Sequence, residues 1–490
     1  MLHTKMTPLL SMRGWRHALL MFVCGGFSAL AFAPFHAWPL LVIGLSTLFL
    51  SLYVCQNKWQ ALRRGWSWGF GFFIVGMYWI CVSMLTDVER FAWMIPFCLL
   101  GLNGGLALFF GLAAMIFSAL KRPHSLHYNL LIFTLCIFAA EMARSLVFTG
   151  LPWNLMGYSW GAHDVSVQIV SVTGIYILTL FTIFMASAPA LLLSHVPMRV
   201  LPSIVAALLL AGALIFGVQR LETAEHSESD VRLRLVQASI PQHLKWNQSF
   251  RPQELQVHKA LSLAEGYEDI DVFIWPETAY PYSISKAEQS IAGVDGLLND
   301  SQMLITGAVT VEQGYQPPKL YNSLVVAKGA DAAIREIYDK QHLVPFGEFV
   351  PLRNVLPVTK ITSGSVDFSS GNEQSLVDSA GLPAFVPLIC YEAIFPAYSN
   401  TQNQAKWLLN ISNDGWFGLT SGPYQHLQAA RFRAIEQGAP MIRSANNGIS
   451  AVFDGYGRMI ASLGLNEEAI LDVNLPNSLT KKTIYSSIAW

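Results

Sequence analysis

The clearest chemical signal in the sequence is a cysteine that ends an apolar run. Cys390 closes the segment Phe385-Val-Pro-Leu-Ile-Cys390, and Tyr391 and Glu392 follow it. A residue at the end of a strand, where the chain enters a turn, presents its side chain to a cleft, as nucleophile elbows do. A free thiol has a pKa of about 8.5, so it needs partners to react near pH 7. Cys390 is therefore either a buried structural thiol or an assisted nucleophile.

Two other predicted strand ends offer such partners. Glu277 follows the run Asp271–Trp275 at a turn that Pro276 breaks, and Lys340 follows Ala333–Tyr338. A carboxylate serves as a general base and an ammonium group stabilises negative charge. Each residue alone is weak evidence, because an acid after a strand is usually a solvated turn residue.

The elements that position these residues have the patterns of an α/β domain. Val231–Gln237 alternates apolar and polar residues, which indicates a strand with one partly covered face. Helical patterns lie between some of the predicted strands, so the region predicts a layered α/β sandwich. The other predicted strands are Asp271–Trp275, Met303–Val309, Ser323–Ala327, Ala333–Tyr338, Ala384–Ile389, Trp407–Ile411 and Gly448–Phe453, and the predicted helices are Pro252–Ala264, Ser285–Leu298 and Tyr424–Gln437.

Composition separates this region from the first part of the chain. The chain has 490 residues, of which 53% are hydrophobic and only 13% charged, against about 25% charged in soluble domains. Charge is sparse before about residue 219 and ordinary after Glu222. We expect a membrane domain at residues 1–221, a catalytic domain at 222–475 and a short tail at 476–490. The net charge of −1 gives no indication of a nucleic-acid partner.

The membrane domain is predicted to cross the bilayer seven times. Lys and Arg residues fall in alternate loops, which places the N-terminus in the cytoplasm and the residues after Glu222 outside it. A cleaved signal peptide ending near Ala33 is an alternative for the first span and leaves that side unchanged. Glu141 and Arg144, one helical turn apart, are expected to form a local ion pair. The candidate spans are Ala18–Ala33, Leu40–Cys55, Trp66–Leu85, Phe91–Leu120, Leu126–Phe148, Val165–Leu193 and Leu201–Val218.

Together, the motifs resemble a specific family. Trp-Pro-Glu277, then Tyr-Asp-Lys340 with Val-Pro-Phe-Gly-Glu348, then Ile-Cys390-Tyr-Glu is similar to the Glu–Lys–Cys pattern of the nitrilase (carbon-nitrogen hydrolase) superfamily. With Asn410-Ile-Ser-Asn-Asp-Gly-Trp-Phe417 and the seven predicted spans, nearly the whole chain resembles the apolipoprotein N-acyltransferases. The resemblance implies an αββα sandwich after a polytopic α-helical membrane domain.

The resemblance also implies a reaction. A fatty acyl chain passes from a glycerophospholipid, through a thioester on Cys390, to the α-amine of a diacylated apolipoprotein. Glu277 is then the general base and acid, and Lys340 stabilises the oxyanion. No cofactor is implied, and the histidines show no metal-binding spacing. The expected location is the inner (cytoplasmic) membrane, with a periplasmic catalytic domain and a monomeric state.

The resemblance assigns supporting roles to further residues. Glu348 supports the lysine, Tyr391 and Glu392 flank the nucleophile, and Trp246 lies in a loop over the site. Packing is the alternative role for Trp246, and an ion pair for Glu392. Structural and substrate-binding roles are equally open for the last group, which consists of Asn413, Asp414 and Trp416.

Other functions remain to be weighed. A membrane-tethered amidase or nitrilase that uses water as acceptor has the same triad, but a soluble substrate needs no seven-span base. A degenerate binding module is disfavoured by the intact triad, and a transporter by the scarcity of ionisable residues in the predicted spans. The family normally has an eighth span, and here only Pro476–Trp490 follows the segment Leu471-Asp-Val-Asn-Leu475.

Overall fold

The chain folds into two compact units in the computed structural model. One comprises Met1–Cys81 and Ala92–Thr223, and the other Val82–Phe91 and Ala224–Trp490. The residues described are 12, 14–225, 227–245, 247–353, 360, 366–373, 376–379, 381–400 and 404–488. Trp246 lies outside these residues, so its predicted place over the site is not described.

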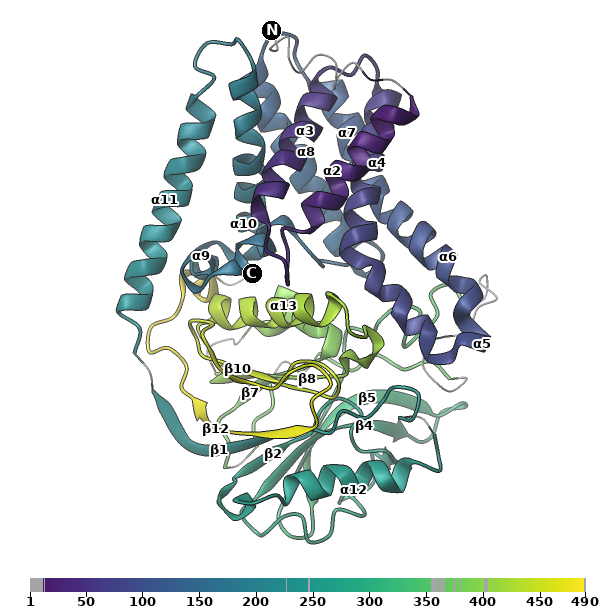
Figure 1. Ribbon diagram of the computed structural model, residues 1–490. Coiled ribbons are helices and arrows are strands. Elements are labelled where there is room, and N and C mark those ends of the chain that lie inside the picture. Colours follow the sequence, from purple (N-terminus) through teal and green to yellow (C-terminus); the bar gives the residue numbers. More distant parts are fainter. Residues whose placement is uncertain are drawn as a thin grey trace. The chain divides into compact units, whose positions relative to one another are not determined.

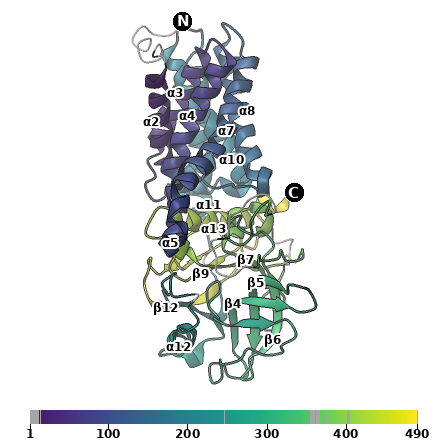
Figure 2. The ribbon, with the colours of Figure 1, turned by 90° about the vertical axis from the view of Figure 1, so that its right-hand side faces the viewer.

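The first unit is helical, and its long helices run side by side (Figures 1 and 2). Among the described residues, four helical stretches are long and apolar enough to cross a membrane: Lys58–Leu120, Leu126–Thr149, Val170–Leu193 and Leu201–Glu222. The number of crossings remains a prediction. The helices are α2 (Trp15–Ala29), α3 (Trp38–Tyr53), α4 (Lys58–Met77), α5 (Val88–Phe91, in the second unit), α6 (Ile95–Phe97), α7 (Asn103–Leu120), α8 (Leu126–Leu146), α9 (Asp164–Val167), α10 (Val170–Ser187) and α11 (Leu201–Glu222).

Glycines let these helices approach closely. A Cβ atom at Gly25 of α2 would lie 1.9 Å from the Trp68 carbonyl oxygen, and one at Gly71 of α4 would lie 1.9 Å from that of Phe22. Small residues at helix contacts are the usual packing device where lipid supplies no hydrophobic driving force. The expected pair of Glu141 and Arg144 is present and buried, at 2.8 Å.

The second unit contains two sheets. The first has the strand order β12-β1-β2-β4-β5-β6, with β3 paired to β4, and the second the order β11-β10-β9-β8-β7. The first and last strands of the domain are neighbours in the first sheet, because β12 pairs antiparallel with β1. The strands are β1 (Glu228–Gln237), β2 (Val272–Ile274), β3 (Ser283–Ser285), β4 (Met303–Glu312), β5 (Lys319–Lys328), β6 (Ala333–Asp339), β7 (Phe385–Ile389), β8 (Trp407–Ser412), β9 (Met441–Ala445), β10 (Ala451–Phe453), β11 (Met459–Ser462) and β12 (Ala469–Pro476).

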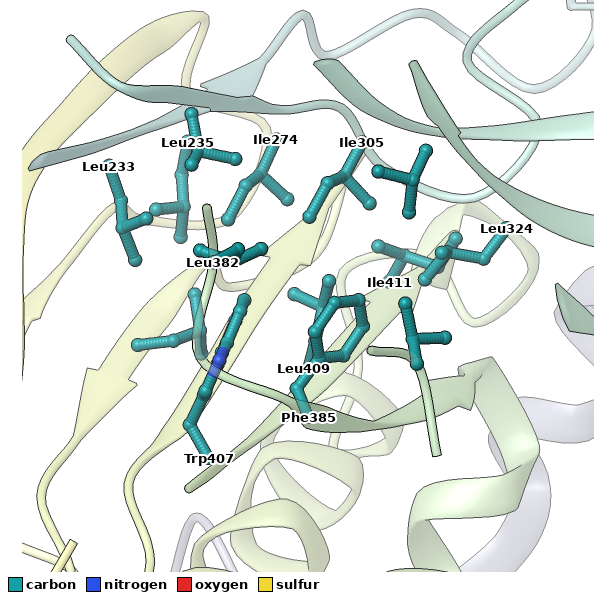
Figure 3. Close-up of a cluster of buried hydrophobic side chains, with 14 of the residues drawn as sticks. Leu233, Leu235, Ile274, Ile305, Leu324, Leu382, Phe385, Trp407, Leu409 and Ile411 are labelled. Carbon is teal, nitrogen blue, oxygen red and sulfur yellow. The ribbon is translucent and has the colours of Figure 1, made fainter. Parts of the chain in front are cut away.

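Alternating side chains build three layers of core. In β2, Val272 and Ile274 point into the cluster between the sheets, whereas Phe273 joins the cluster on the outer face of the first sheet. This alternation follows from the two-residue period of a strand. Leu233, Leu235, Ile274, Ile305 and Leu324 of the first sheet face Phe385, Trp407, Leu409 and Ile411 of the second (Figure 3).

Helices cover the two outer faces. Leu255 of α12 (Arg251–Ser262) packs in the outer cluster of the first sheet. Leu427 and Ala430 of α13 (Gly422–Gln437) pack in the outer cluster of the second. The layers are therefore helix, sheet, sheet and helix (Figure 1), and the predicted fold class is confirmed.

The predicted helix at Ser285–Leu298 is wrong. Only β3 and irregular turns occupy this segment. Gly293 and Gly296 both have left-handed φ angles, of 74° and 71°, which no helix interior accepts. The apolar side chains Ile291, Val294 and Leu297 are nevertheless buried in the outer cluster of the first sheet, so their spacing reflects burial from turns.

Candidate active site

The nucleophile candidate lies at a strained turn. Cys390 directly follows β7, is buried, and has a φ of 50°, in the left-handed region that non-glycine residues rarely occupy. Such conformations persist only where the surroundings enforce them, and they cluster at active sites. Burial raises the pKa of the Cys390 thiol, and Glu277 raises it further, whereas Lys340 lowers it. The net effect is upward, so the resting thiol keeps its proton at neutral pH.

The carboxyl group of Glu277 is held from both sides. Glu277 lies on the turn after β2, and this turn packs on β4. A Cβ atom at Gly307 of β4 would lie 2.6 Å from the Glu277 Cα. Only glycine permits this approach. Glu277 Oε1 accepts a hydrogen bond from Asn322 Nδ2 at 2.7 Å, and Oε2 accepts one from the backbone N–H of Asn413 at 2.8 Å.

Lys340 directly follows β6 and sits between two carboxylates. Its Nζ lies 3.0 Å from Glu348 Oε2 and 3.6 Å from Glu277 Oε1. Burial alone would lower the pKa of Lys340, but Glu348 and Glu277 outweigh it and raise that pKa, so the buried side chain is a charged ammonium group. Glu348 also accepts from the backbone N–H of Val344 at 2.8 Å, which fixes the turn that carries it.

Two polar residues that the sequence analysis missed complete this cluster. Asn322 of β5 donates through Nδ2 to Glu277 Oε1 and, at 2.8 Å, to Glu348 Oε1. Its amide orientation is unambiguous, because the amide oxygen would be repelled by both carboxylates. Lys245, also buried, donates to the backbone carbonyl of Glu277 at 3.0 Å and holds the turn from behind.

Glu392 ties the nucleophile turn to the lysine turn. Its carboxylate accepts hydrogen bonds from the backbone N–H groups of Ile389 (2.7 Å), Gln341 (2.7 Å) and His342 (3.1 Å), and from the Tyr338 hydroxyl (3.0 Å). These donors come from both sheets. Burial raises the pKa of Glu392 to about 7, although the hydrogen bonds and Lys340 act in the opposite direction. The neighbouring Tyr391 packs against Phe395 and His342.

The segment after β8 forms the adjacent wall. The side chain of Asn413 accepts from the N–H of Gly415 and donates to Gln242, in addition to the backbone bond with Glu277. Trp416 ends the short 3₁₀ helix Asp414–Trp416 and is half-buried. The structure thus brings Asn413 to Glu277, and among the described residues it shows no polar contact that assigns a role to Trp416.

A pocket of about 380 Å³ opens beside this wall. Its size falls within the range of small-molecule sites. The lining residues combine four uncharged polar side chains and one acidic side chain with glycine, proline and leucine, and comprise Ser239, Pro241, Gln242, Asp414, Gly415, Gly418, Leu419, Asn447 and Asn466.

One group of side chains has donor atoms spaced as metal ligands are. Atoms of Cys390, Asp414 and His426 lie within 4.8 Å of one another. However, the Asp414 carboxylate is already paired with Arg443 at 2.6 Å, and His426 Nε2 is bonded to the Cys390 carbonyl oxygen. A cation would meet the charge of Arg443, so this donor set does not fit a metal well. The sequence-based expectation of no metal remains a prediction.

Comparison with known proteins gives the class of this domain. Residues 232–485 match the Carbon-nitrogen hydrolase family, and residues 24–188 match the Apolipoprotein N-acyltransferase N-terminal domain. A two-sheet sandwich with Glu277, Lys340 and Cys390 at strand ends is thus a carbon-nitrogen hydrolase domain, joined here to helices that are apolar enough for a membrane.

Relatives over nearly the full length narrow the assignment. Proteins named apolipoprotein N-acyltransferase are 39% identical in Rhodopseudomonas palustris (97% of this chain, 92% of the relative), 36% in Rickettsia typhi (96% and 94%) and 36% in Bradyrhizobium diazoefficiens (97% and 92%). This chain belongs to the apolipoprotein N-acyltransferase family. The resemblance and the enzyme class that the sequence predicted, an acyltransferase, are confirmed.

Proposed function

We propose that this membrane protein transfers a fatty acyl chain from a glycerophospholipid to the α-amine of a diacylglyceryl-cysteine at the N-terminus of apolipoproteins. The observation that carries the proposal is the buried cluster in which Lys340 lies 3.6 Å from Glu277 and both interact electrostatically with the buried Cys390 thiol. That combination supplies a nucleophile, a proton acceptor and a positive charge in one buried site.

The first half-reaction forms the acyl-enzyme. Glu277 takes the Sγ proton as the sulfur attacks the ester carbonyl carbon of the phospholipid, and a carbon–sulfur bond forms. The negative charge on the carbonyl oxygen is stabilised by Lys340, which contributes on the order of a few kcal/mol. The carbon–oxygen bond then breaks, Glu277 returns the proton to the departing alcohol oxygen, and a lysophospholipid leaves. The acyl chain remains on Cys390 as a thioester.

The second half-reaction consumes the thioester. The neutral α-amine attacks the thioester carbonyl, Glu277 takes a proton from the nitrogen, and the carbon–sulfur bond breaks. The proton returns to the sulfur, and the product is an amide. Glu277 serves both steps because Asn322 and the backbone of Asn413 hold its two oxygens in place.

The domain boundaries and the compartment are part of the proposal. Residues 1–221 form the membrane domain, 222–475 the catalytic domain and 476–490 a tail, in an inner membrane with the catalytic domain on the periplasmic side. A reporter that is active only outside the cytoplasm should be active when fused after Glu222 and inactive when fused after Arg122. The reverse pair of results contradicts the orientation.

A stalled turnover tests the reaction itself. Purified enzyme given phospholipid alone should release about one lysophospholipid per active site and then stop, with a fatty acyl group on Cys390 detected by mass spectrometry. Water must be a poor acceptor there, or the thioester would be lost before the lipoprotein arrives. A diacylated lipopeptide with a free α-amine should restart turnover, and its N-acetylated form should not.

The controls separate a transferase from a hydrolase. Cys390→Ala should give neither thioester nor product while its helices still insert in the membrane. Steady release of fatty acid without any amine acceptor, at a rate comparable to that with one, would show a hydrolase and refute the proposal.

A further inference from the structure

A buried polar network lies behind the nucleophile, on the second sheet. His426 of α13 and Asp414 of the turn after β8 are both completely buried, as is Arg443 of β9. Arg443 Nη2 lies 2.6 Å from Asp414 Oδ2, and His426 Nδ1 lies 2.9 Å from Asp414 Oδ1. Burial alone would raise the pKa of Asp414, but Arg443 and His426 hold that pKa well below its usual range. Asp414 is therefore an ionised centre.

The network reaches Cys390 at its backbone. His426 Nε2 lies 3.0 Å from the Cys390 carbonyl oxygen. A carbonyl oxygen only accepts hydrogen bonds, so Nε2 carries a hydrogen. Burial and Arg443 lower the pKa of His426, so the ring is neutral and its Nδ1 accepts from Arg443 Nη2 at 3.1 Å. The same oxygen has a second, longer bond, from Asn410 Nδ2 at 3.4 Å, and Arg443 also holds Asn410 through its Oδ1.

A second branch reaches the thiol. The Ser412 hydroxyl donates to Asp414 Oδ1 at 2.8 Å, and the interaction of Ser412 with the Cys390 side chain lowers the pKa of that thiol. Asp414 is thus linked to both ends of one residue. Its neighbours His426 and Ser412 interact with the Cys390 carbonyl oxygen and with the Cys390 side chain, respectively.

This arrangement explains how Cys390 keeps its left-handed φ of 50°. That conformation is unfavourable for a residue with a Cβ atom, so it must be imposed by the surroundings. A bond to the carbonyl oxygen fixes the peptide plane after Cys390, and a relaxed turn would swing Sγ away from Glu277 and Lys340.

We infer that His426, held by Arg443 within the buried cluster around Asp414, is a positioning residue that fixes the Cys390 turn and so sets the reactivity of the thiol. The inference rests on the proposed role of Cys390 as nucleophile. It places His426 behind the reacting atoms, in contact with neither substrate.

A matched pair of substitutions tests it. The side-chain nitrogen of glutamine reaches about as far as His426 Nε2, whereas that of asparagine reaches only about as far as Nδ1. H426Q should therefore keep the donor to the Cys390 carbonyl, and H426N should lose it. Two rates are measured on the full-length protein in detergent: alkylation of Cys390 by iodoacetamide, followed at its own peptide, and thioester formation from phospholipid.

We expect H426N to slow both rates by about 10-fold or more, since a buried acceptor is left without its main donor. H426Q should stay within about 3-fold of the wild type. The melting temperatures of both variants control for a general loss of structure. A general loss of structure would slow both variants, and would not leave H426Q near the wild-type rate while H426N is slow.

Two results overturn the inference: alkylation of H426N within about 3-fold of the wild type, or H426Q no faster than H426N. If H426N does not fold, Ser412→Ala decides, because losing the second branch should slow alkylation about 5-fold and an unchanged rate contradicts the network. A wild type that is alkylated at Cys390 but never forms a thioester defeats the proposed function alone, and alkylation still decides the role of His426.

Discussion

Asn322 offers the sharpest test of how the acid and the lysine are held. Its Nδ2 donates to Glu277 Oε1 at 2.7 Å and to Glu348 Oε1 at 2.8 Å, and all three side chains are buried. Hydrogen bonds to charged groups are worth about 1.5–3 kcal/mol each. In Asn322→Ala the two carboxylates keep Lys340 as partner, so we expect the acylation barrier to rise by about 2–3 kcal/mol, which slows acylation about 30- to 150-fold.

Asn322→Asp is nearly isosteric and should be worse than alanine. It replaces a shared donor by a third carboxylate within hydrogen-bond distance of two others, around a single ammonium group. We expect at least about another 10-fold loss at pH 8, with partial recovery as the pH falls, because a protonated Asp can donate again.

The assay is the single-turnover rate of thioester formation, followed by mass spectrometry of the intact protein, with melting temperature as the stability control. An aspartate variant that is as fast as the alanine variant at pH 8, or within about 3-fold of the wild type, would show that Asn322 does not organise the two acids.

Three further outcomes follow from the geometry. The alkylation rate of Cys390 should keep rising with pH beyond about 8.5, the pKa of a free thiol, because burial and Glu277 raise the pKa of Cys390; a plateau near neutral pH contradicts a protonated resting thiol. Gly307→Ala should slow acylation more than about 10-fold, since the new Cβ would lie 2.3 Å from the Thr278 nitrogen. The control Gly105→Ala, whose Cβ would have no atom within 4 Å, should leave the rate unchanged. Equal acylation rates in the two variants would refute the close approach at Gly307. Burial raises the pKa of Glu254 to about 7, above the roughly 4.3 of an exposed Glu, so its contribution to stability is complete below pH ~4.3 and is lost as the pH rises to 7. Glu254→Gln should therefore flatten the fall of melting temperature between about pH 4.5 and 7, and an unchanged slope contradicts this.

The sequence was informative where local pattern decides structure. Cys390, Glu277 and Lys340 each follow a run of strand residues and precede a turn, and the structure places all three directly after or close to a strand end. Apolar runs and turn residues can be recognised locally in the sequence, and the order of the three motifs along the chain gives the family resemblance. The roles of these residues remain a proposal.

Residues whose importance depends on strand pairing could not be predicted. Asn322 looks like an ordinary strand residue until the hairpin of β5 and β6 is aligned. Ser323 then pairs with Asp339, and the Lys340 N–H donates to the Asn322 carbonyl oxygen. The signal in the sequence is the polar side chain of Asn322 opposite Lys340, and it can be recognised only once the pairing register of β5 and β6 is known. Likewise, the helical spacing of Ile291, Val294 and Leu298 did not reveal the left-handed glycines between them.

β12 is the last strand of the first sheet to be synthesised, and this has a consequence for the order in which the domain forms. β12 is the partner of β1, and Arg234 of β1 is paired with Asp472 of β12 at 2.7 Å. All three triad residues leave the ribosome before β12 does. A nascent chain that has reached Ser450 already carries Cys390, yet β1 still lacks its β12 partner, and Arg234 lacks its carboxylate. The thiol therefore exists for some time in an unfinished domain. Sheet completion therefore comes later in synthesis than the appearance of Cys390, and Arg234 gains its carboxylate partner only at that stage.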